Sequence, residues 1–287
     1  MIGHRPLQNV TCPYCGVSLH RRRRTKEHVI GRCFVPVGSL EQAWNVILWA
    51  CSGCNRKKSA LEDDISAITM HFHVAGLRGM DDAILQKEAV RKSVRSFSRK
   101  TRKSVAESSS AVRVSTPLGA DGTITSSFTA PPQVDDARTD ELARMQMMAF
   151  FYVLTYQEAT RIGHWWPGGF YPLHGTIKTD WGNAIHRAFT KEVQLWDYRL
   201  IGTTAHGYYR VMIRRHPKAE CWAWGVEWND SYRLIGFFGD FDIAKGISEK
   251  LPELPVHTFA QGPNHWVRFR EEQSLPEDAD TMFTLPD

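Results

Sequence analysis

The sequence has no hydrophobic run long enough to cross a membrane. Its most apolar stretch, 147–154, falls far short of the ~20 residues that a membrane span requires. The first residues contain no apolar segment typical of a secretory signal. We therefore expect a cytoplasmic protein in a reducing compartment, without a membrane partner. Internal repeats are also lacking.

Acidic residues are scarce in the first part of the chain. Positions 1–60 hold ten Lys or Arg against two acids, and positions 91–103 hold seven basic residues and no acid. The last stretch, 271–287, has the opposite composition, with six acids and no base. The basic first part indicates an anionic partner, for which nucleic acid is the first hypothesis. A solvated basic face without a partner is the alternative.

The periodicity of apolar residues predicts an α+β fold. Four helices are predicted, at about 52–65, 81–105, 139–162 and 181–196. Three strands are predicted, at 208–213, 221–228 and 232–238. The turn residues Asn229-Asp230-Ser231 between the last two favour an antiparallel meander. The helix over 139–162, with Thr139 as its N-cap, is apolar around its circumference and is expected to be a buried central helix.

We expect three segments along the chain. Residues 1–75 would form a small first domain, and residues 137–287 an α+β domain with an antiparallel sheet. Residues 76–136 would form a basic helix followed by a Ser/Thr/Gly/Pro-rich linker or hairpin. Basic residues recur at every fourth position of that helix, at Arg91, Arg95, Arg99 and Lys103. This stripe would either contact phosphates or form a solvated helix face.

Four of the six cysteines form two CxxC pairs, Cys12-Pro-Tyr-Cys15 and Cys51-Ser-Gly-Cys54. Two thiolates with this spacing in a tight turn reach one tetrahedral Zn²⁺, and two such turns complete a structural site. Four thiolates leave no open position for water or substrate. In a reducing compartment disulfides are the weaker explanation, and no thioredoxin-like pattern supports a redox pair.

Other cysteines and several tryptophans are expected to serve packing alone. Cys33 and Cys221 stand apart from the pairs and are expected to be small buried hydrophobic residues. Trp222, Trp224 and Trp228 share one face of their predicted strand, and core packing is a better explanation for them than base stacking.

An ordered set of polar residues accompanies the cysteine pairs. The segment Thr25-Lys-Glu-His-Val-Ile30 contains Glu27 and His28, Asn45 follows, and Asn55 comes directly after Cys54, three positions before Lys58. The order CxxC, acid-His, Asn, CxxCNxxK resembles the zinc-stapled branch of the HNH endonuclease family, over about positions 10–65. Asn55 stands at a signature position that is often histidine, and Gly31 follows His-Val-Ile where many members carry proline.

The resemblance implies a ββα-metal, treble-clef-like fold, in which two strands and a helix hold one catalytic divalent ion such as Mg²⁺. It implies that His28 is the general base and that Glu27 and Asn55 are ligands of the ion. Asn45 would hold the loop behind the base, and Lys58 would lie near the phosphate. Histidine titrates near neutrality, and hard oxygen ligands suit Mg²⁺. Since adjacent strand residues point to opposite sides, a local distortion near Glu27 is expected.

Further basic residues are candidates for contacts with the phosphate backbone. These are Arg21, Arg22, Arg23, Arg24, Arg32, Arg56 and Lys57. The hypothesis is an HNH endonuclease that hydrolyses DNA, with RNA as a further candidate substrate, in restriction, anti-phage defence or a mobile-element or phage setting. The alternative is a zinc-dependent nucleic-acid-binding protein without catalysis. Glu27 would then face solvent, Asn55 would cap a helix and His28 would be satisfied in the core. Residues 137–287 would act as a sensor or specificity module, with a protein partner or another trigger.

Overall fold

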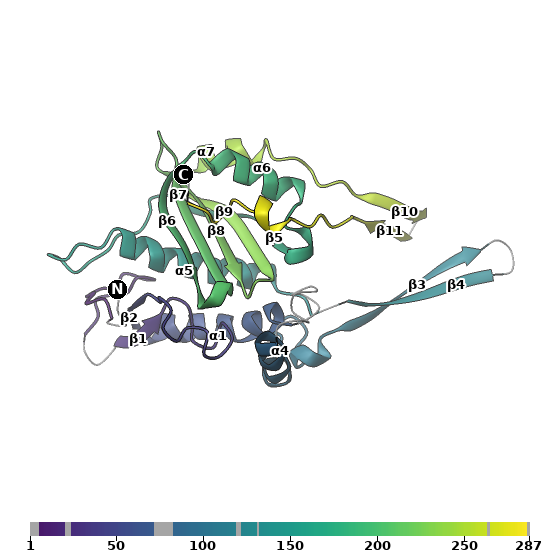
Figure 1. Cartoon of the computed structure of the whole chain (residues 1–287), viewed down its shortest axis with the longest axis horizontal. Coiled ribbons are helices and arrows are strands. Elements are labelled where there is room, and N and C mark those ends of the chain that lie inside the picture. The colour runs from purple at the N-terminus through teal and green to yellow at the C-terminus, as the bar shows by residue number, and fades with distance from the viewer. Residues whose placement is uncertain are drawn as a thin grey trace.

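The computed structural model describes residues 6–20, 24–71, 83–118, 122–130, 132–262 and 265–285. The predicted phosphate contacts Arg21, Arg22 and Arg23 lie outside these ranges. Helices combine with antiparallel sheets, so the predicted α+β class is confirmed. Helix α5 (Asp136–Leu154) lies between the largest sheet and the N-terminal elements (Figure 1). Within the described ranges, no helix combines the length and apolar character needed to cross a membrane.

The N-terminal unit is a β-hairpin followed by a helix. Strand β1 (Arg24–His28) pairs antiparallel with β2 (Ile47–Cys51), and α1 (Ser52–Thr69) begins directly after β2. Cys51 is the N-cap of α1, since its backbone is extended and its sulfur accepts a hydrogen bond from the Cys54 N–H. The predicted start of this helix is confirmed. Two strands and a helix follow one another in the order that the resemblance implied, whereas the HNH family itself stays a prediction.

The basic helix predicted over 81–105 is shorter than expected. Helix α4 spans Ala83–Arg95, and the chain turns directly after it. The turn is held by α1, because the Asp64 carboxylate accepts a hydrogen bond from the Arg99 N–H at 3.1 Å. Arg99 and Lys103 therefore lie outside the helix, and the predicted four-residue stripe is wrong.

Two long hairpins extend from the body of the molecule (Figure 1). A 3-10 turn η1 (Val105–Glu107) leads into β3 (Ser110–Leu118), which pairs along its whole length with β4 (Gly122–Ala130). The hairpin alternative to a linker is thus confirmed. The second hairpin consists of β10 (His257–Gly262) and β11 (His265–Phe269), which the sequence patterns did not predict.

Helix α5 is the predicted buried central helix. Most of its residues from Leu142 onward are buried, as expected for a helix that is apolar on nearly all sides. It begins earlier than predicted, with Asp135 and not Thr139 as its N-cap. It also ends earlier, because the Thr155 hydroxyl donates to the Phe151 carbonyl and accepts from the His164 N–H, which turns the chain back.

The largest sheet has five strands in the order β5-β9-β8-β7-β6, all antiparallel. The strands are β5 (Gly169–Ile177), β6 (Asp197–Thr204), β7 (Tyr209–Arg215), β8 (Cys221–Trp228) and β9 (Tyr232–Gly239). The last three are the predicted meander, which is confirmed. Strands β5 and β6 were not predicted.

Short helices complete this half of the chain. Helix α6 (Ala184–Val193) is shorter than the helix predicted over 181–196, because Asn183 caps it. Helix α7 (Phe241–Ser248) was not predicted. Three 3-10 turns lie between the larger elements, namely η2 (Lys178–Asp180), η3 (Ala205–Gly207) and η4 (Glu277–Ala279).

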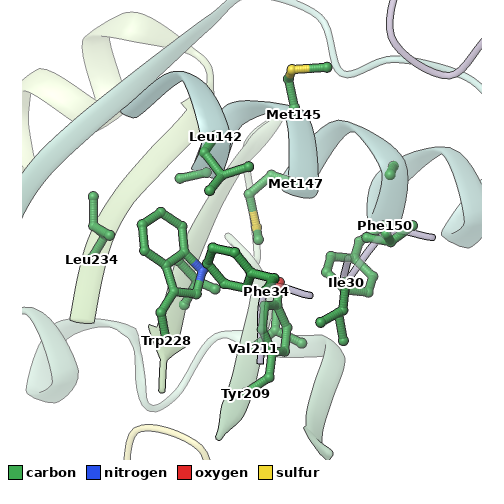
Figure 2. Close-up of a cluster of buried hydrophobic side chains, with 14 of the residues drawn as sticks. Ile30, Phe34, Leu142, Met145, Met147, Phe150, Tyr209, Val211, Trp228 and Leu234 are labelled. Atoms are coloured by element: carbon green, nitrogen blue, oxygen red, sulfur yellow. The ribbon is translucent and has the colours of Figure 1, made fainter. Parts of the chain in front are cut away.

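One hydrophobic core joins the first and last predicted segments. Ile30 and Phe34, from the loop after β1, pack between α5 and the sheet (Figure 2). The Phe34 ring meets Trp228 edge-on at 5.5 Å. The side chain of Asn229, in the turn after β8, donates to the Phe34 carbonyl at 3.1 Å and to Thr69 Oγ1 at 2.8 Å. The N-terminal unit is therefore built into the core of the larger sheet.

The packing predictions are mostly confirmed. Trp222, Trp224 and Trp228 are buried, as is Cys221. Cys33 is exposed, so its predicted burial is wrong. Cys33 lies in the loop after β1, and the side chain of the next residue, Phe34, packs into the core.

Candidate functional site

The four predicted zinc ligands come together at the start of α1. Their sulfur atoms, from Cys12, Cys15, Cys51 and Cys54, all lie within 4.8 Å of one another. The sulfurs of Cys15 and Cys51 are 3.7 Å apart. Tetrahedral zinc with Zn–S bonds of about 2.3 Å separates its sulfurs by about 3.8 Å. The cluster is therefore compatible with one structural zinc ion.

The first cysteine pair lies in a tight turn. The Gly16 N–H donates to the Cys12 carbonyl at 2.9 Å, and Gly16 has a φ of 73°, a left-handed conformation that favours glycine. Trp165, from the loop before β5, covers this glycine and donates its indole N–H to the Pro13 carbonyl at 2.6 Å. The turn is thus held by its own backbone and by a residue distant in sequence.

Burial shapes the chemistry of these thiols. It raises the pKa of Cys12 to about 11, although hydrogen bonds from neighbouring backbone N–H groups oppose the shift. Burial also raises the pKa of Cys54 above its usual range. Thiols bind zinc as thiolates, so metal binding here must release protons.

His28 ends β1, and its ring is half-buried. No other side chain within the described ranges forms a hydrogen bond with the ring. Burial lowers the pKa of His28, and the positive charges of Arg32, Lys26 and Lys58 lower it further. The ring is therefore neutral near pH 7, with one nitrogen able to accept a proton.

Asn45 clamps the backbone that follows His28. Its side-chain N–H donates to the Ile30 carbonyl at 2.8 Å, and its Oδ1 accepts from the Ile30 N–H at 3.3 Å. The backbone N–H and the carbonyl of Ile30 are thereby both paired with the side-chain amide of Asn45. These contacts are of the kind that the resemblance implied for Asn45.

Asn55 connects the first turn of α1 to β1. Its side-chain N–H groups donate to Thr25 Oγ1 at 2.8 Å and to the Lys26 carbonyl at 3.3 Å. Its Oδ1 has no donor within the described residues and is available as a ligand atom. The alternative role of Asn55 as a helix cap is wrong, since Cys51 caps α1.

Glu27 points into the protein and not to the surface. Its Oε1 lies 2.9 Å from Lys58 Nζ and accepts a hydrogen bond from the Tyr14 hydroxyl at 3.0 Å. Lys58 is fully buried and also donates to Glu62 Oε1 at 2.6 Å and to the His28 carbonyl at 3.0 Å. The predicted phosphate contact of Lys58 is therefore wrong, because its ammonium is enclosed between two carboxylates.

Only one of the two predicted ligands of the catalytic metal ion is available in this structure. Glu27 is 2% exposed and its charge is matched by Lys58, so it does not fit the role of a metal ligand in this conformation. Nor does it face solvent, as the alternative required. Asn55 Oδ1 is the one predicted ligand that remains open. In the part of the chain that the structure describes, the four cysteines are the only group of three or more such side chains arranged to hold a metal.

Two residues that the sequence reasoning missed complete the network around Lys58. Glu62 follows Lys58 by one helical turn, a spacing that signals an ion pair. Tyr14 lies inside the first CxxC pair, and nothing in its local pattern indicated a buried hydroxyl.

Glu62 also accepts a hydrogen bond from the Gly31 N–H at 3.1 Å. A side chain at Gly31 would come too close to the Glu62 carboxylate, and proline would lack the N–H that bonds to it. Both contacts favour glycine at position 31.

The predicted phosphate contacts have different surroundings. The Arg24 guanidinium lies over the Trp49 ring, 4.2 Å from its centre. The Lys57 ammonium is 2.5 Å from Glu141 Oε1, so its charge is already paired. Arg32 and Arg56 are exposed. These two are the predicted contacts with the greatest access to a nucleic acid among the residues that are described.

Comparisons with known proteins gave no family model, no curated protein and no solved structure that matches this chain. The case for a function therefore depends on the residues themselves. Of those, the described part of the structure joins the four cysteines into one cluster and ties Asn45 and Asn55 to the ends of the segment that carries His28.

Proposed function

We propose that this protein is a zinc-stabilised nuclease that hydrolyses DNA phosphodiester bonds with His28 as the general base. One arrangement supports the proposal above all others. The four-cysteine cluster lies at the junction of β2 and α1. The neighbouring strand β1 carries His28, whose ring has no hydrogen-bond partner among the residues that the structure describes. A neutral, half-buried and unpaired imidazole is suited to general-base chemistry.

The role of His28 follows from its ring. A ring nitrogen takes a proton from a water molecule while the water oxygen forms a bond to phosphorus. The bond from phosphorus to the leaving oxygen breaks, and that oxygen takes up a proton from solvent. Asn45 holds the backbone beyond His28, and the Lys58 ion pairs hold the end of β1 against α1. The backbone around His28 is thereby held in place, while its ring forms no hydrogen bond with the described residues.

The test is cleavage of plasmid DNA by the full chain, with Mg²⁺ and with EDTA. His28→Ala is expected to reduce the rate by about 10²–10⁴-fold, the usual contribution of a general base. His164→Ala, at an exposed histidine in the loop before β5, is the matched control and should cleave as the parent does. Equal rates for the parent and His28→Ala would overturn the proposal. EDTA sensitivity at intact zinc content would show that a second divalent ion is required, with Asn55 Oδ1 as its first candidate ligand.

A second candidate is a zinc-dependent nucleic-acid-binding protein without catalysis. It is favoured by one observation, the enclosure of the Glu27 carboxylate by Lys58 and Tyr14. Gel-shift titration of duplex DNA at several salt concentrations separates the two candidates. Salt-sensitive binding without cleavage, in the presence of Mg²⁺ or Mn²⁺, would favour the second. The logarithm of the affinity falls with the logarithm of the salt concentration, with a slope set by the number of phosphate contacts. Arg32→Gln and Arg56→Gln should each reduce this slope by about the share of one contact.

A further inference from the structure

A cavity without an assigned role lies at the far end of the chain, between α6 and the segment 274–281. Its volume is about 370 Å³, which is within the range of about 300–1,000 Å³ typical of small-molecule sites. One wall is the face of α6 that carries His186, Arg187 and Lys191, and the C-terminal segment forms the opposite wall. Figure 1 shows the yellow turn η4 of this segment beside α6.

His186 is the most unusual residue of the cavity wall. It is 1% exposed, and neither ring nitrogen has a hydrogen-bond partner within the described residues. His174 packs edge-on against it, with 5.3 Å between the ring centres, and so supplies no polar partner. Burial lowers the pKa of His186 well below its usual value, so the ring is neutral, with one donor and one acceptor nitrogen. Buried polar groups are almost always paired in native proteins, and this pair of free nitrogens calls for a ligand.

A second unpaired donor lies in the same wall. The indole N–H of Trp181 is buried and has no partner among the residues described. The Arg233 guanidinium covers the face of this ring, at 4.0 Å from its centre. Trp181 therefore offers a ligand its N–H group and not a stacking surface.

The exposed charges that line the cavity are positive. Arg187 and Lys191 are exposed at its rim, and Arg233 lies in its wall. Among the described residues that line it, Asp280 is the one acid. Arg233 Nη2 pairs with that carboxylate at 2.5 Å and with the buried Glu227 carboxylate at 2.7 Å, so the charge of Arg233 is already matched. Two cations at the rim are thus left to attract an anion, above donors that are buried.

We propose that this cavity binds a small anionic molecule with a phosphate or carboxylate group. Arg187 and Lys191 pair with the charge of the ligand, and His186 forms a hydrogen bond with it. The site is independent of the proposed nuclease chemistry, because none of its residues belongs to the N-terminal unit. It provides a specific ligand site in the half of the chain for which the sequence indicated no chemistry.

The test is isothermal titration of the full chain with inorganic phosphate, glycerol 3-phosphate and malonate, each at the same ionic strength. At least one anion is expected to bind saturably at one site per chain and to raise the melting temperature. The double variant Arg187→Gln/Lys191→Gln should weaken this binding at least tenfold. The matched control, Lys218→Gln/Lys245→Gln, removes two exposed cations outside the cavity and should bind within twofold of the parent. Tighter binding of the phosphates identifies a phosphorylated ligand, and tighter binding of malonate a carboxylate.

His186→Phe provides a second readout that does not depend on loss of folding. Phenylalanine keeps an aromatic ring and removes both unpaired nitrogens, so the melting temperature of the ligand-free variant should be equal to or above that of the parent. Its affinity for the anion should fall at least tenfold. The proposal would be overturned if none of the three anions bound to the parent at anion concentrations up to about 10 mM, tenfold above a millimolar Kd. Unchanged binding by His186→Phe or by the double variant would also overturn it, since the cavity would then hold water alone.

Discussion

Lys58 carries a positive charge at a place without solvent access. Burial alone would lower the pKa of its ammonium, but the charges of Glu62 and Glu27 and their hydrogen bonds outweigh this effect and raise the pKa. Burial raises the pKa of Glu62 in turn, against the opposing pull of Lys58. The ammonium therefore compensates the charges of the buried Glu27 carboxylate and the partly buried Glu62 carboxylate, and it holds β1 against α1.

We predict that Lys58→Met destabilises the protein by about 3–5 kcal/mol, because it leaves the buried Glu27 carboxylate without its partner. Lys57→Met is the matched control, since the neighbouring Lys57 side chain is 58% exposed and forms one surface ion pair. That change should cost less than about 1 kcal/mol. Urea unfolding followed by circular dichroism measures both. A Lys58→Met protein as stable as the Lys57→Met protein would show that the network contributes nothing.

The same residues show the limits of reasoning from sequence at this scale. The motif marked Glu27, His28 and Lys58 as candidates for catalysis. It did not indicate that Glu27 and Lys58 pair with each other, because that depends on which side of β1 faces α1. Tyr14 and Glu62, which complete the network, had no family signature to mark them.

At the scale of elements, the turn between β8 and β9 connects the two strands and also forms hydrogen bonds with the N-terminal unit. Asn229 and Asp230 have φ angles of 56° and 53°, the left-handed pair expected of a tight hairpin turn. The Asn229 side chain donates to the Phe34 carbonyl and to Thr69 Oγ1, and Ser231 Oγ donates to the Thr69 carbonyl. The turn thus holds both the end of α1 and the loop after β1.

We predict different costs for two substitutions at Asn229. Asn229→Gly keeps the left-handed backbone but loses two buried hydrogen bonds, and it should cost about 2 kcal/mol at roughly 1 kcal/mol per bond. Asn229→Ala loses the same bonds and adds the strain of a left-handed residue with a Cβ, about 1–2 kcal/mol more. Equilibrium unfolding of the two variants side by side provides the measurement. Equal stabilities would mean that the turn carries no backbone strain.

Element prediction succeeded where neighbours in sequence decide the structure. The meander β7–β9 was predicted because its strands are continuous apolar runs separated by turn residues. The early end of α4 was missed, because the chain after it is held by Asp64 of α1, which is distant in sequence. The Asp64 carboxylate accepts a hydrogen bond from the Arg99 N–H. Strand β5 was missed because Pro172 lies within it, at a bulge opposite β9.

At the scale of the whole molecule, the N-terminal unit and the five-stranded sheet share one core. Ile30 and Phe34 lie in the same cluster as Trp228 and the buried face of α5 (Figure 2). Removal of residues 137–287 would expose this cluster. Functional tests of the N-terminal unit therefore require the full chain.

We predict that removal of zinc destabilises the whole chain in a single transition, because the core is shared. Cys15→Ser should lower the zinc content below one ion per chain and lower the melting temperature. Cys33→Ser changes an exposed cysteine outside the cluster and is the control. Zinc content by mass spectrometry and thermal unfolding by circular dichroism provide the two readouts. Unfolding in two separate steps after chelation, with the sheet unaffected, would contradict the shared core.

The sequence by itself determined the local features of this protein. The two CxxC turns, the start of α1 after Cys51 and the Asn229-Asp230 turn depend on a few adjacent residues, whose backbone preferences are sufficient to fix them. The tertiary structure decided everything that depends on which surfaces meet. It enclosed the Glu27 carboxylate with Lys58, and it left the two nitrogens of His186, beside a cavity, without a hydrogen bond to any described residue. Burial and charge pairing are set by residues far apart in the chain, and these are the quantities on which the chemistry of both candidate sites depends.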